Sequence, residues 1–342
     1  MENEILIKQS FDVYQRFSGI IDILQEAGAI KDGDIIVDVG GYPGMLADAL
    51  DVTAPAVRTV TVDHPHARRP GYARGSAENL PLKDKSADVV IASDVLEHIP
   101  TRLRSDVISE MIRISRRWIV FGAPFDHPVV TEADERLNEL YRKVDGMPNK
   151  WLLEHIENGL PKLEAVTNKL KDAGASVSVI PNGSVVSWFI MASAQALFDC
   201  LPLVSGFKPM LSEMFNRVWA SLDEELPPYR HIIIGDMKSE YQKENIENIK
   251  STPVQDEKAL EKMAAIHDLA LKIIEELNTR LADTENLTPH LAARTVRQLE
   301  EIIEFQEKEV RRLTEGLQSR DKVIEAYQSN PLFKLLSRLG LK

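Results

Sequence analysis

Hydrophobic residues in the first two thirds of the chain form short, nearly continuous runs, separated by stretches with helical spacing. Runs rich in Val and Ile are typical of parallel strands that are buried on both faces. They predict strands at Ile35–Val39, Thr59–Val62, Ala87–Ala92, Trp118–Gly122, Ser176–Ile180 and His231–Gly235. Helices are predicted between them at Gly44–Leu50, Arg102–Ser115 and Pro161–Ala173. The alternation predicts an α/β fold with a mostly parallel sheet covered by helices.

An apolar segment, Val185–Leu222, separates the last two predicted strands and is rich in aromatic residues and methionine. It predicts a helical insert, at about residues 182–228, that lies beside the sheet. Two interpretations are open for this insert: it adds to the hydrophobic core, or it lines a substrate site.

From Tyr241 the composition shifts to Glu, Lys, Gln, Leu and Ala without any strand pattern. Two seams with alternating spacings of three and four residues run from Leu260 to Leu281 and from Leu299 to Tyr327, with a break at Thr288–Pro289. Such seams predict a coiled coil or a helical hairpin. We expect the coiled coil to join copies of the chain into a homo-oligomer, with an intramolecular hairpin as the alternative.

The last residues, 330–342, differ again. Leu332, Leu335, Leu336 and Leu339 share one helical face, and Lys334, Arg338 and Lys342 supply three positive charges without an acid. A basic amphipathic helix of this kind binds an anionic membrane surface or a groove on a partner protein. A self-packed terminus is the alternative. The predicted division is therefore a domain at 1–240, a helical coiled-coil region at 241–329 and a basic tail at 330–342.

Composition narrows the class of protein. The chain has 342 residues with a formal net charge of −12, so general electrostatic binding of nucleic acid is not expected. Its single cysteine excludes an internal disulfide and a thiolate zinc cage, which favours a reducing, cytoplasmic location. The longest apolar stretch, Val185–Phe198, is too short to span a bilayer.

The clearest chemical signal is a strand that runs into a glycine turn and then a helix, Asp38-Val39-Gly40-Gly41-Tyr42-Pro43-Gly44. Glycines let a ligand approach the backbone, and the free N–H groups of the helix start favour an anion. Asp63 ends the next predicted strand, where a carboxylate accepts hydrogen bonds from ribose hydroxyls in nucleotide-binding folds. A short-chain dehydrogenase is disfavoured, because none of the seven tyrosines has a lysine four residues later.

A third motif is longer and more specific. Gly75-Ser76-Ala77-Glu78-Asn79-Leu80-Pro81-Leu82-Lys83-Asp84-Lys85-Ser86-Ala87-Asp88 leads into Ser93-Asp94-Val95-Leu96-Glu97-His98. With the glycine turn and Asp63, these residues resemble the class I S-adenosylmethionine-dependent methyltransferases of the type 11 branch, over about residues 30–125. The resemblance implies a Rossmann-like, mostly parallel seven-stranded sheet with S-adenosyl-L-methionine as cofactor.

The resemblance also implies roles for single residues. Asp38, Gly40, Gly41 and Gly44 would hold the methionine part of the cofactor, and Asp63 would bind the ribose. Ser76 and Ala77 would contact the adenine, and Asp94 would lie beside the methionine end. Two positions depart from the family pattern: Tyr42 replaces a glycine, and Ser76 stands where an acid often bonds the adenine amino group.

An oxygen acceptor needs alignment and a base that removes its proton. Histidine suits this task near neutral pH, and three candidates follow strands or lie near them: His127, His98 and His155. His64 and His66 lack further residues at ligand spacing, so no metal ligand set is predicted.

The segment Trp151–Pro161, with Ile180-Pro181-Asn182-Gly183 and Trp188, is similar to methyltransferases of bacterial surface-polysaccharide assembly. This resemblance implies O-methylation of a sugar or phosphosugar group of a cell-surface glycan. The alternative is a non-catalytic scaffold that acts through its coiled coil in a glycan-assembly complex. The basic tail, residues 330–342, is predicted to bind the inner face of the membrane or a protein of that complex.

Overall fold

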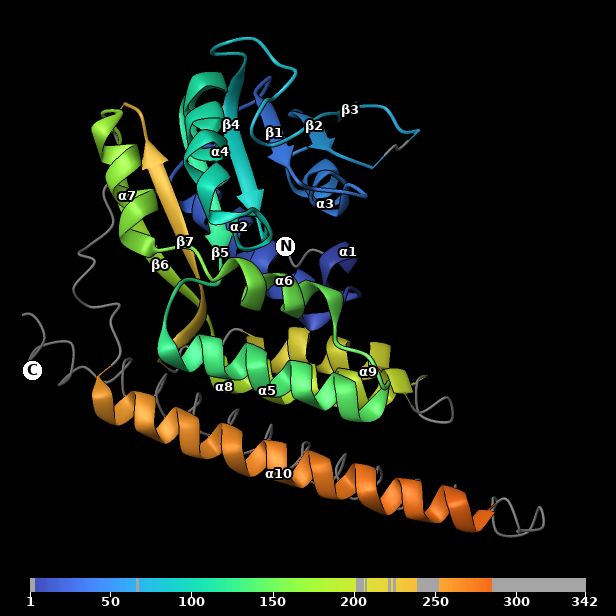
Figure 1. Cartoon of the computed structure of the whole chain (residues 1–342). Coiled ribbons are helices and arrows are strands. Elements are labelled where there is room, and N and C mark those ends of the chain that lie inside the picture. The colour runs from blue at the N-terminus through green and yellow to red at the C-terminus, as the bar shows by residue number, and fades with distance from the viewer. Residues whose placement is uncertain are drawn as a thin grey trace, which may run out of the picture. The chain divides into compact units, whose positions relative to one another are not determined.

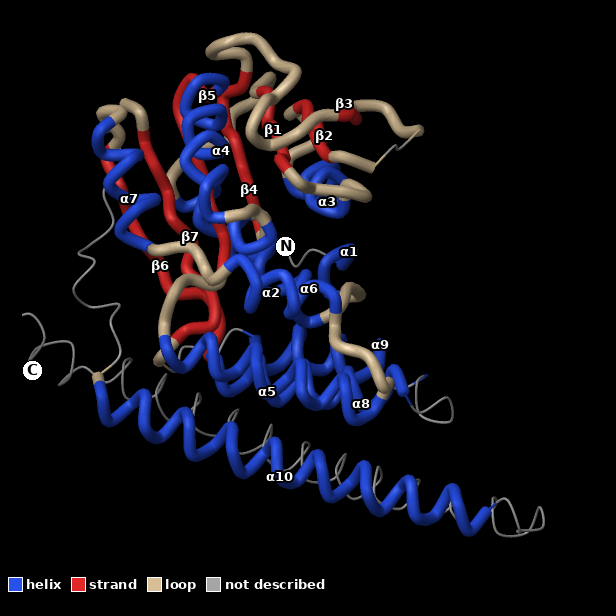
Figure 2. The backbone as a smooth tube through the Cα atoms, viewed as in Figure 1, coloured by secondary structure: helices blue, strands red, loops and turns tan. Residues whose placement is uncertain are grey.

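A seven-stranded sheet lies at the centre of the computed structural model, which describes residues 4–65, 68–200, 206, 208–220, 223, 226–238 and 252–284. The strand order is β3-β2-β1-β4-β5-β7-β6 (Figures 1 and 2). β7 is antiparallel to β5 and to β6, and the other pairings are parallel. The strands are β1 (Ile35–Val39), β2 (Arg58–Asp63), β3 (Tyr72–Arg74), β4 (Ala87–Ser93), β5 (Ser115–Ala123), β6 (Ser176–Ser184) and β7 (Pro228–Asp236).

The described helices lie before, between and after these strands. They are α1 (Glu4–Ile7), α2 (Phe11–Glu26), α3 (Met45–Thr53), the 3₁₀ turn η1 (Leu96–His98), α4 (Thr101–Ile114), α5 (Pro128–Val144), α6 (Lys150–Asn158), α7 (Leu163–Asp172), α8 (Val185–Cys200), α9 (Lys208–Met214), a π-helical turn (Phe215–Trp219) and α10 (Pro253–Thr284).

Successive residues of the central strands enter different hydrophobic clusters, because strand side chains alternate between the two faces. Val37 of β1 packs with α4 and α7, whereas its neighbour Ile36 packs with α2 and α3. Ile119 and Val120 of β5 divide in the same way. The sheet is therefore buried on both faces, which explains why its strands are nearly continuous in Val and Ile.

A third hydrophobic cluster forms a helical cap beyond the carboxyl end of β5. It joins residues of α5, α8 and α10 to Tyr229 at the start of β7. The ring of Tyr229 stacks on Trp188 of α8, with centroids 3.6 Å apart. Figure 1 shows α5, α6 and α8 on the side of the sheet to which β4 points. The predicted helical insert is confirmed by α8 and α9, and it contributes to both the core and the cavity described below.

The first predicted heptad seam begins within α10. Met263, Ala270 and Ile274 are buried in the same cluster as α5 and α8, so this part of the seam packs within the chain. The chain divides into two compact units, Met1–Ile274 and Glu275–Lys342. The second seam and the basic tail lie outside the described residues, so the coiled coil and the predicted boundary at 240 stay predictions.

All six strands expected from the sequence are present, and the sheet is mostly parallel as predicted. The seventh strand, β3, has only three residues and pairs at the edge of the sheet with β2. Three helices that position much of the site, α2, α5 and α6, were not predicted from the sequence.

Candidate functional site

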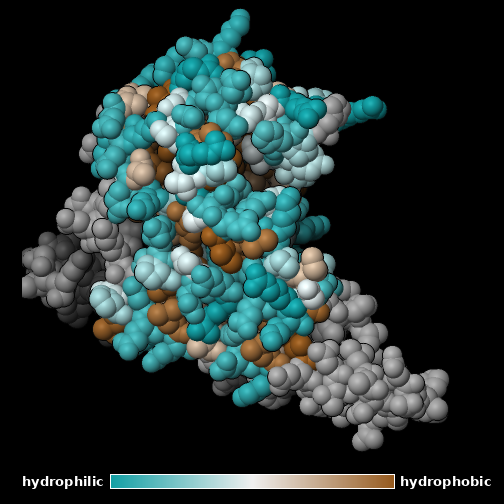
Figure 3. Space-filling model, in the orientation of Figure 1, coloured by the Kyte–Doolittle hydropathy of each residue, from teal (hydrophilic) through white to brown (hydrophobic). Residues whose placement is uncertain are grey.

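A cavity of about 840 Å³ opens between the carboxyl ends of β1, β2 and β4 and the cap helices. Its lining includes Gly40 and Asp63 at one end and residues of α5, α6 and α8 at the other. In Figure 3, hydrophobic surface is visible in the middle of this face, at the level where Figure 1 places α6. Trp151 of α6 lines the cavity and is 57% exposed. Ligands of open parallel sheets bind at this edge.

The glycine turn after β1 has the backbone geometry of a ligand cradle. Gly40 has a φ of 75° and lines the cavity, where an added Cβ would lie 2.5 Å from Val95. A Cβ on Gly41 would lie 1.8 Å from Oδ2 of Asp38. Gly44, with a φ of 105°, is the residue that precedes α3. Gly41 and Gly44 shape the turn, and only Gly40 among the three lines the cavity.

Asp38 is buried beneath this turn, with 1% of its surface exposed. Its Oδ2 atom has no hydrogen-bond partner. Burial raises the pKa of Asp38 to about 7, although the positive charge of Arg16 opposes the shift. Asp38 therefore supports the turn from below instead of lining the cavity.

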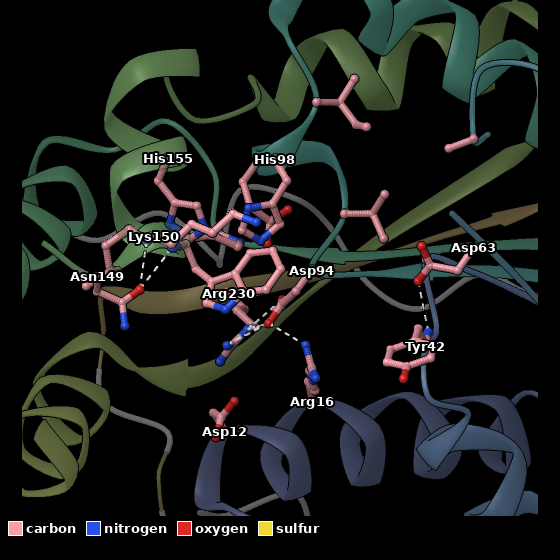
Figure 4. A pocket seen from close by; sticks show the side chains of 18 of the residues that line it. Asp12, Arg16, Tyr42, Asp63, Asp94, His98, Asn149, Lys150, His155 and Arg230 are labelled. Carbon is pink, nitrogen blue, oxygen red and sulfur yellow. Dashed lines mark hydrogen bonds and ion pairs between the residues drawn. The ribbon is translucent and has the colours of Figure 1, made fainter. Parts of the chain in front are cut away.

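Asp63, at the end of β2, faces the turn and lines the cavity. Its carboxylate accepts hydrogen bonds from two backbone N–H groups, that of Tyr42 at 3.0 Å and that of His64 at 2.6 Å. Figure 4 shows the bond from Tyr42. The Tyr42 ring is 48% exposed and lies edge-on to Tyr72 at 6.4 Å. The two backbone bonds fix the carboxylate and leave further lone pairs for a ligand.

The third motif brings its residues to the same end of the cavity. Ala77 and Glu78 line it, whereas Ser76 does not. Ser76 instead donates a hydrogen bond from its hydroxyl to the Glu78 carboxylate, and this bond is the main cause that lowers the pKa of Glu78. The structure thus supplies an acid here although position 76 is a serine.

Asp94 follows β4 and lies in the middle of the cavity lining, with a φ of 52°. Two arginines from distant parts of the chain hold it (Figure 4). Arg16 of α2 donates to Oδ2 at 2.9 Å, and Arg230 of β7 donates to both carboxylate oxygens, with closest distances of 2.8 Å. Burial would raise the pKa of Asp94, but the charges of Arg230 and Arg16 outweigh it and hold the pKa well below the usual range.

Two of the three candidate bases lie together at the cap end. The rings of His98 and His155 are 4.8 Å apart, and both line the cavity (Figure 4). Nδ1 of His98 pairs with Glu154 at 2.9 Å, and Nδ1 of His155 pairs with Asp134 at 2.8 Å. Burial and the charge of His155 lower the pKa of His98. Burial of His155 is outweighed by Asp134, so the pKa of His155 is raised.

His127, the third candidate, is placed elsewhere. It precedes α5, where its Nδ1 accepts a hydrogen bond from the backbone of Val129 at 3.3 Å. Its Nε2 lies 3.5 Å from Asp256 of α10. His127 does not line the cavity, in contrast to His98 and His155.

Several residues of the cavity lining were not predicted from the sequence. Arg16 and Arg230 lie 78 and 136 residues from Asp94 along the chain, and no local pattern connects them to it. Glu97 stood within the recognised motif without an assigned role, yet it lines the cavity beside the two histidines and is 1% exposed. Burial, and then the charge of Asp94, raise the pKa of Glu97 to about 8.

Comparisons with known proteins match part of the chain. Residues 38–117, from the glycine turn into β5, match the family described as "Methyltransferase domain". An uncharacterized methyltransferase of Mycobacteroides abscessus is 34% identical over 110 residues, which are 28% of this chain and 42% of that protein. One of Mycobacterium sp. (strain KMS) is 37% identical over 107 residues, 28% of this chain and 41% of that protein. The chain thus spans about two fifths of the length of these curated relatives.

Solved structures show similarity over a longer part of the chain. Magnesium protoporphyrin IX methyltransferase of Synechocystis PCC 6803, solved with bound SAH, is 15% identical with a TM-score of 0.39. The alignment covers 65% of this chain and 82% of that one. A phosphoethanolamine N-methyltransferase of Haemonchus contortus is 15% identical with a TM-score of 0.41, over 64% of this chain and 52% of that one.

The match to the methyltransferase domain thus covers residues 38–117, which lie within a fold built on a seven-stranded, mostly parallel, Rossmann-like sheet. Among the described residues, no helix has the length and apolar character needed to cross a membrane.

Proposed function

We propose that this protein is an S-adenosylmethionine-dependent methyltransferase that O-methylates a sugar or phosphosugar group of a cell-surface glycan. The observation that carries the proposal is that one cavity joins the glycine turn and Asp63 at one end to polar and aromatic residues of the cap helices at the other. When bound, S-adenosylmethionine supplies a methyl group on a positively charged sulfur. The chain's own residues must bind this cofactor and align the acceptor.

The residues at the first end fit an adenosyl cofactor. Gly40 lines the cavity with its backbone, and a side chain is disfavoured there because a Cβ would lie 2.5 Å from Val95. Asp63 presents a fixed carboxylate for the ribose hydroxyls, and Ala77 and Glu78 line the place for the adenine. Glu78 would accept a hydrogen bond from the adenine amino group, since Glu78 lines the cavity and Ser76 does not.

The cap end fits a polar acceptor with apolar faces, such as a sugar. Trp151, Trp188 and Tyr141 supply aromatic surface, and Asn149 and Lys150 supply polar groups that fix orientation. The Lys150 ammonium lies 4.9 Å from the Trp151 ring centroid, where its charge would also favour a phosphorylated sugar. His98 or His155 would take the proton of the acceptor hydroxyl.

Cofactor binding is the first test. Calorimetric titration with S-adenosylmethionine is expected to give one site per chain. Asp63→Ala leaves ribose donors unpaired at about 1–3 kcal/mol, a loss of roughly five- to 150-fold in affinity.

Asp51→Ala is the matched control, since Asp51 is an exposed aspartate of α3 away from the cavity lining. It should bind like the wild type. Failure of the wild type to bind at millimolar cofactor contradicts the enzymatic proposal and favours the scaffold alternative. Acceptor classes are then separated by incubating the protein with labelled cofactor and either nucleotide sugars or oligosaccharides, and by measuring methylated product by mass spectrometry.

We also propose that residues 299–327 join copies of the chain and that residues 330–342 bind an anionic membrane or a partner. Replacing Leu313 and Leu317 by Asp should convert the oligomer to a monomer in sedimentation velocity, because charges enter the apolar seam. Deleting residues 330–342 should abolish sedimentation with anionic liposomes while the oligomeric state persists. An unchanged sedimentation coefficient in the Asp variant contradicts the coiled-coil proposal.

A further inference from the structure

Three potential metal ligands converge at the cap end of the cavity. Glu97 and His98 come from η1, and His155 comes from α6. One ligand atom can be chosen from each residue so that all three lie within 4.8 Å of one another. Ligand atoms around one zinc ion at about 2.1 Å lie roughly 3.4 Å apart, so small side-chain rotations close the set.

The surroundings of the Glu97 carboxylate independently indicate a bound cation. Glu97 is 1% exposed, and neither of its oxygens has a hydrogen-bond partner. A buried carboxylate without partners is strongly unfavourable unless something pairs with it. Asp94 is nearby, but it is itself an anion held by two arginines, so it repels the Glu97 carboxylate and does not compensate it. A cation bound between Glu97 and the histidines would supply the missing partner.

The two histidines have the carboxylate partner at one ring nitrogen that is typical of metal-binding histidines. Each ring is held at Nδ1 by a carboxylate, His98 by Glu154 and His155 by Asp134. Asp134 is itself fixed by the hydroxyl of Tyr229 at 2.8 Å. A carboxylate behind the imidazole sets the ring orientation and strengthens the other nitrogen as a ligand. Both Nε2 atoms are then the atoms available to an ion.

We propose that Glu97, His98 and His155 bind a divalent transition-metal ion, such as zinc or manganese, at the cap end of the cavity. Two imidazoles and one carboxylate are a ligand set suited to such ions. All three residues line the cavity, so positions on the ion stay open to a ligand. The one part that rests on the proposed function is the role of the ion. It would fix an oxygen of the acceptor and would replace the two histidines, whose Nε2 atoms it occupies, as the group that promotes loss of the hydroxyl proton.

The test uses the full chain without S-adenosylmethionine. After removal of adventitious metal, titration with Co²⁺ is followed by visible absorption, and titration with Zn²⁺ and Mn²⁺ is followed by calorimetry. We expect saturation at one ion per chain. Glu97→Gln preserves the shape of the side chain and removes its negative charge, so binding should weaken at least 100-fold while the fold, checked by circular dichroism, is kept. His155→Gln should weaken binding similarly.

Two further variants separate this site from nonspecific binding. Asp134→Asn removes the carboxylate behind His155 and should weaken binding about 10- to 100-fold. His127→Ala removes a histidine that lies outside the cavity lining, and it should bind the ion like the wild type.

A wild type without saturable binding at millimolar metal, or a folded Glu97→Gln variant that binds like the wild type, overturns the proposal. Cofactor titration on the same samples keeps the two proposals apart, because ion binding without cofactor binding rejects only the enzymatic function, and the reverse rejects only the metal site.

Discussion

Asp38→Asn is expected to make the protein more stable than the wild type at pH 8, by up to about 4 kcal/mol. The pKa of Asp38 rises from 3.8 in a model peptide to about 7 in the fold because the carboxyl is buried. At 1.36 kcal/mol per pKa unit, a rise of roughly three units gives this upper limit. A folded-state pKa above the unfolded value means that the folded state keeps the proton, so wild-type stability falls as the pH rises from about 4 to 7. The asparagine variant does not have this loss.

The measurement is urea unfolding of both proteins at pH 4 and at pH 8. The stability difference between variant and wild type should be larger at pH 8 than at pH 4. Asp51→Asn, an exposed change on α3, should show no such dependence. Parallel stability profiles of Asp38→Asn and wild type would show that the Asp38 carboxyl is ionised in the fold without penalty.

Asp94→Asn should destabilise the protein by about 3–5 kcal/mol, because it removes the charge that compensates a buried arginine. The side chain of Arg230 is only 5% exposed, and that of Arg16 is 17% exposed. Asparagine tolerates the φ of 52° at this position, so the change isolates the charge from the backbone geometry. Urea or thermal unfolding measures the loss.

Two comparisons test the cause. Asp84→Asn removes a similar pair with Arg113, but Asp84 is 76% exposed, so the loss should stay within about 1 kcal/mol. The double variant Asp94→Asn with Arg230→Met should recover part of the stability, since no unpaired cation remains at position 230. If the single and the double variant lose the same free energy of unfolding, the loss is caused by removal of the Asp94 carboxylate and not by the unpaired charge of Arg230.

The sheet was predictable from the sequence where burial on both faces dictates composition. Ile35–Val39 and Ala87–Ala92 are nearly continuous in apolar residues, and both are strands. Tyr72–Arg74 was missed because an edge strand of three residues needs no apolar run. The direction of β7 was not predictable either, since antiparallel pairing with β5 and β6 depends on where the chain returns after the insert.

The same distinction separates the site residues that were predictable from the sequence from those that were not. Gly40 and Asp63 were predictable as cavity-lining residues because a glycine turn and a strand end are local features, and the fold brings both to one edge of the sheet. Glu97 was passed over because its lack of partners is a property of the packed structure. Arg230 carries no local signal, since only strand pairing aims it at Asp94.

The pairing of Asp94 also bears on the order in which the molecule is completed during synthesis. Its two arginines lie 78 residues before it and 136 residues after it. Contacts between such distant positions form late, because the loop between them must close first. Asp94 is also synthesised 136 residues before Arg230. Until β7 has been made, Arg16 is the only one of the two arginines that can pair with Asp94. We expect the residues that line the cavity to be exposed in the nascent domain during this interval. Aggregation and chaperone binding should therefore occur most readily before β7 is added.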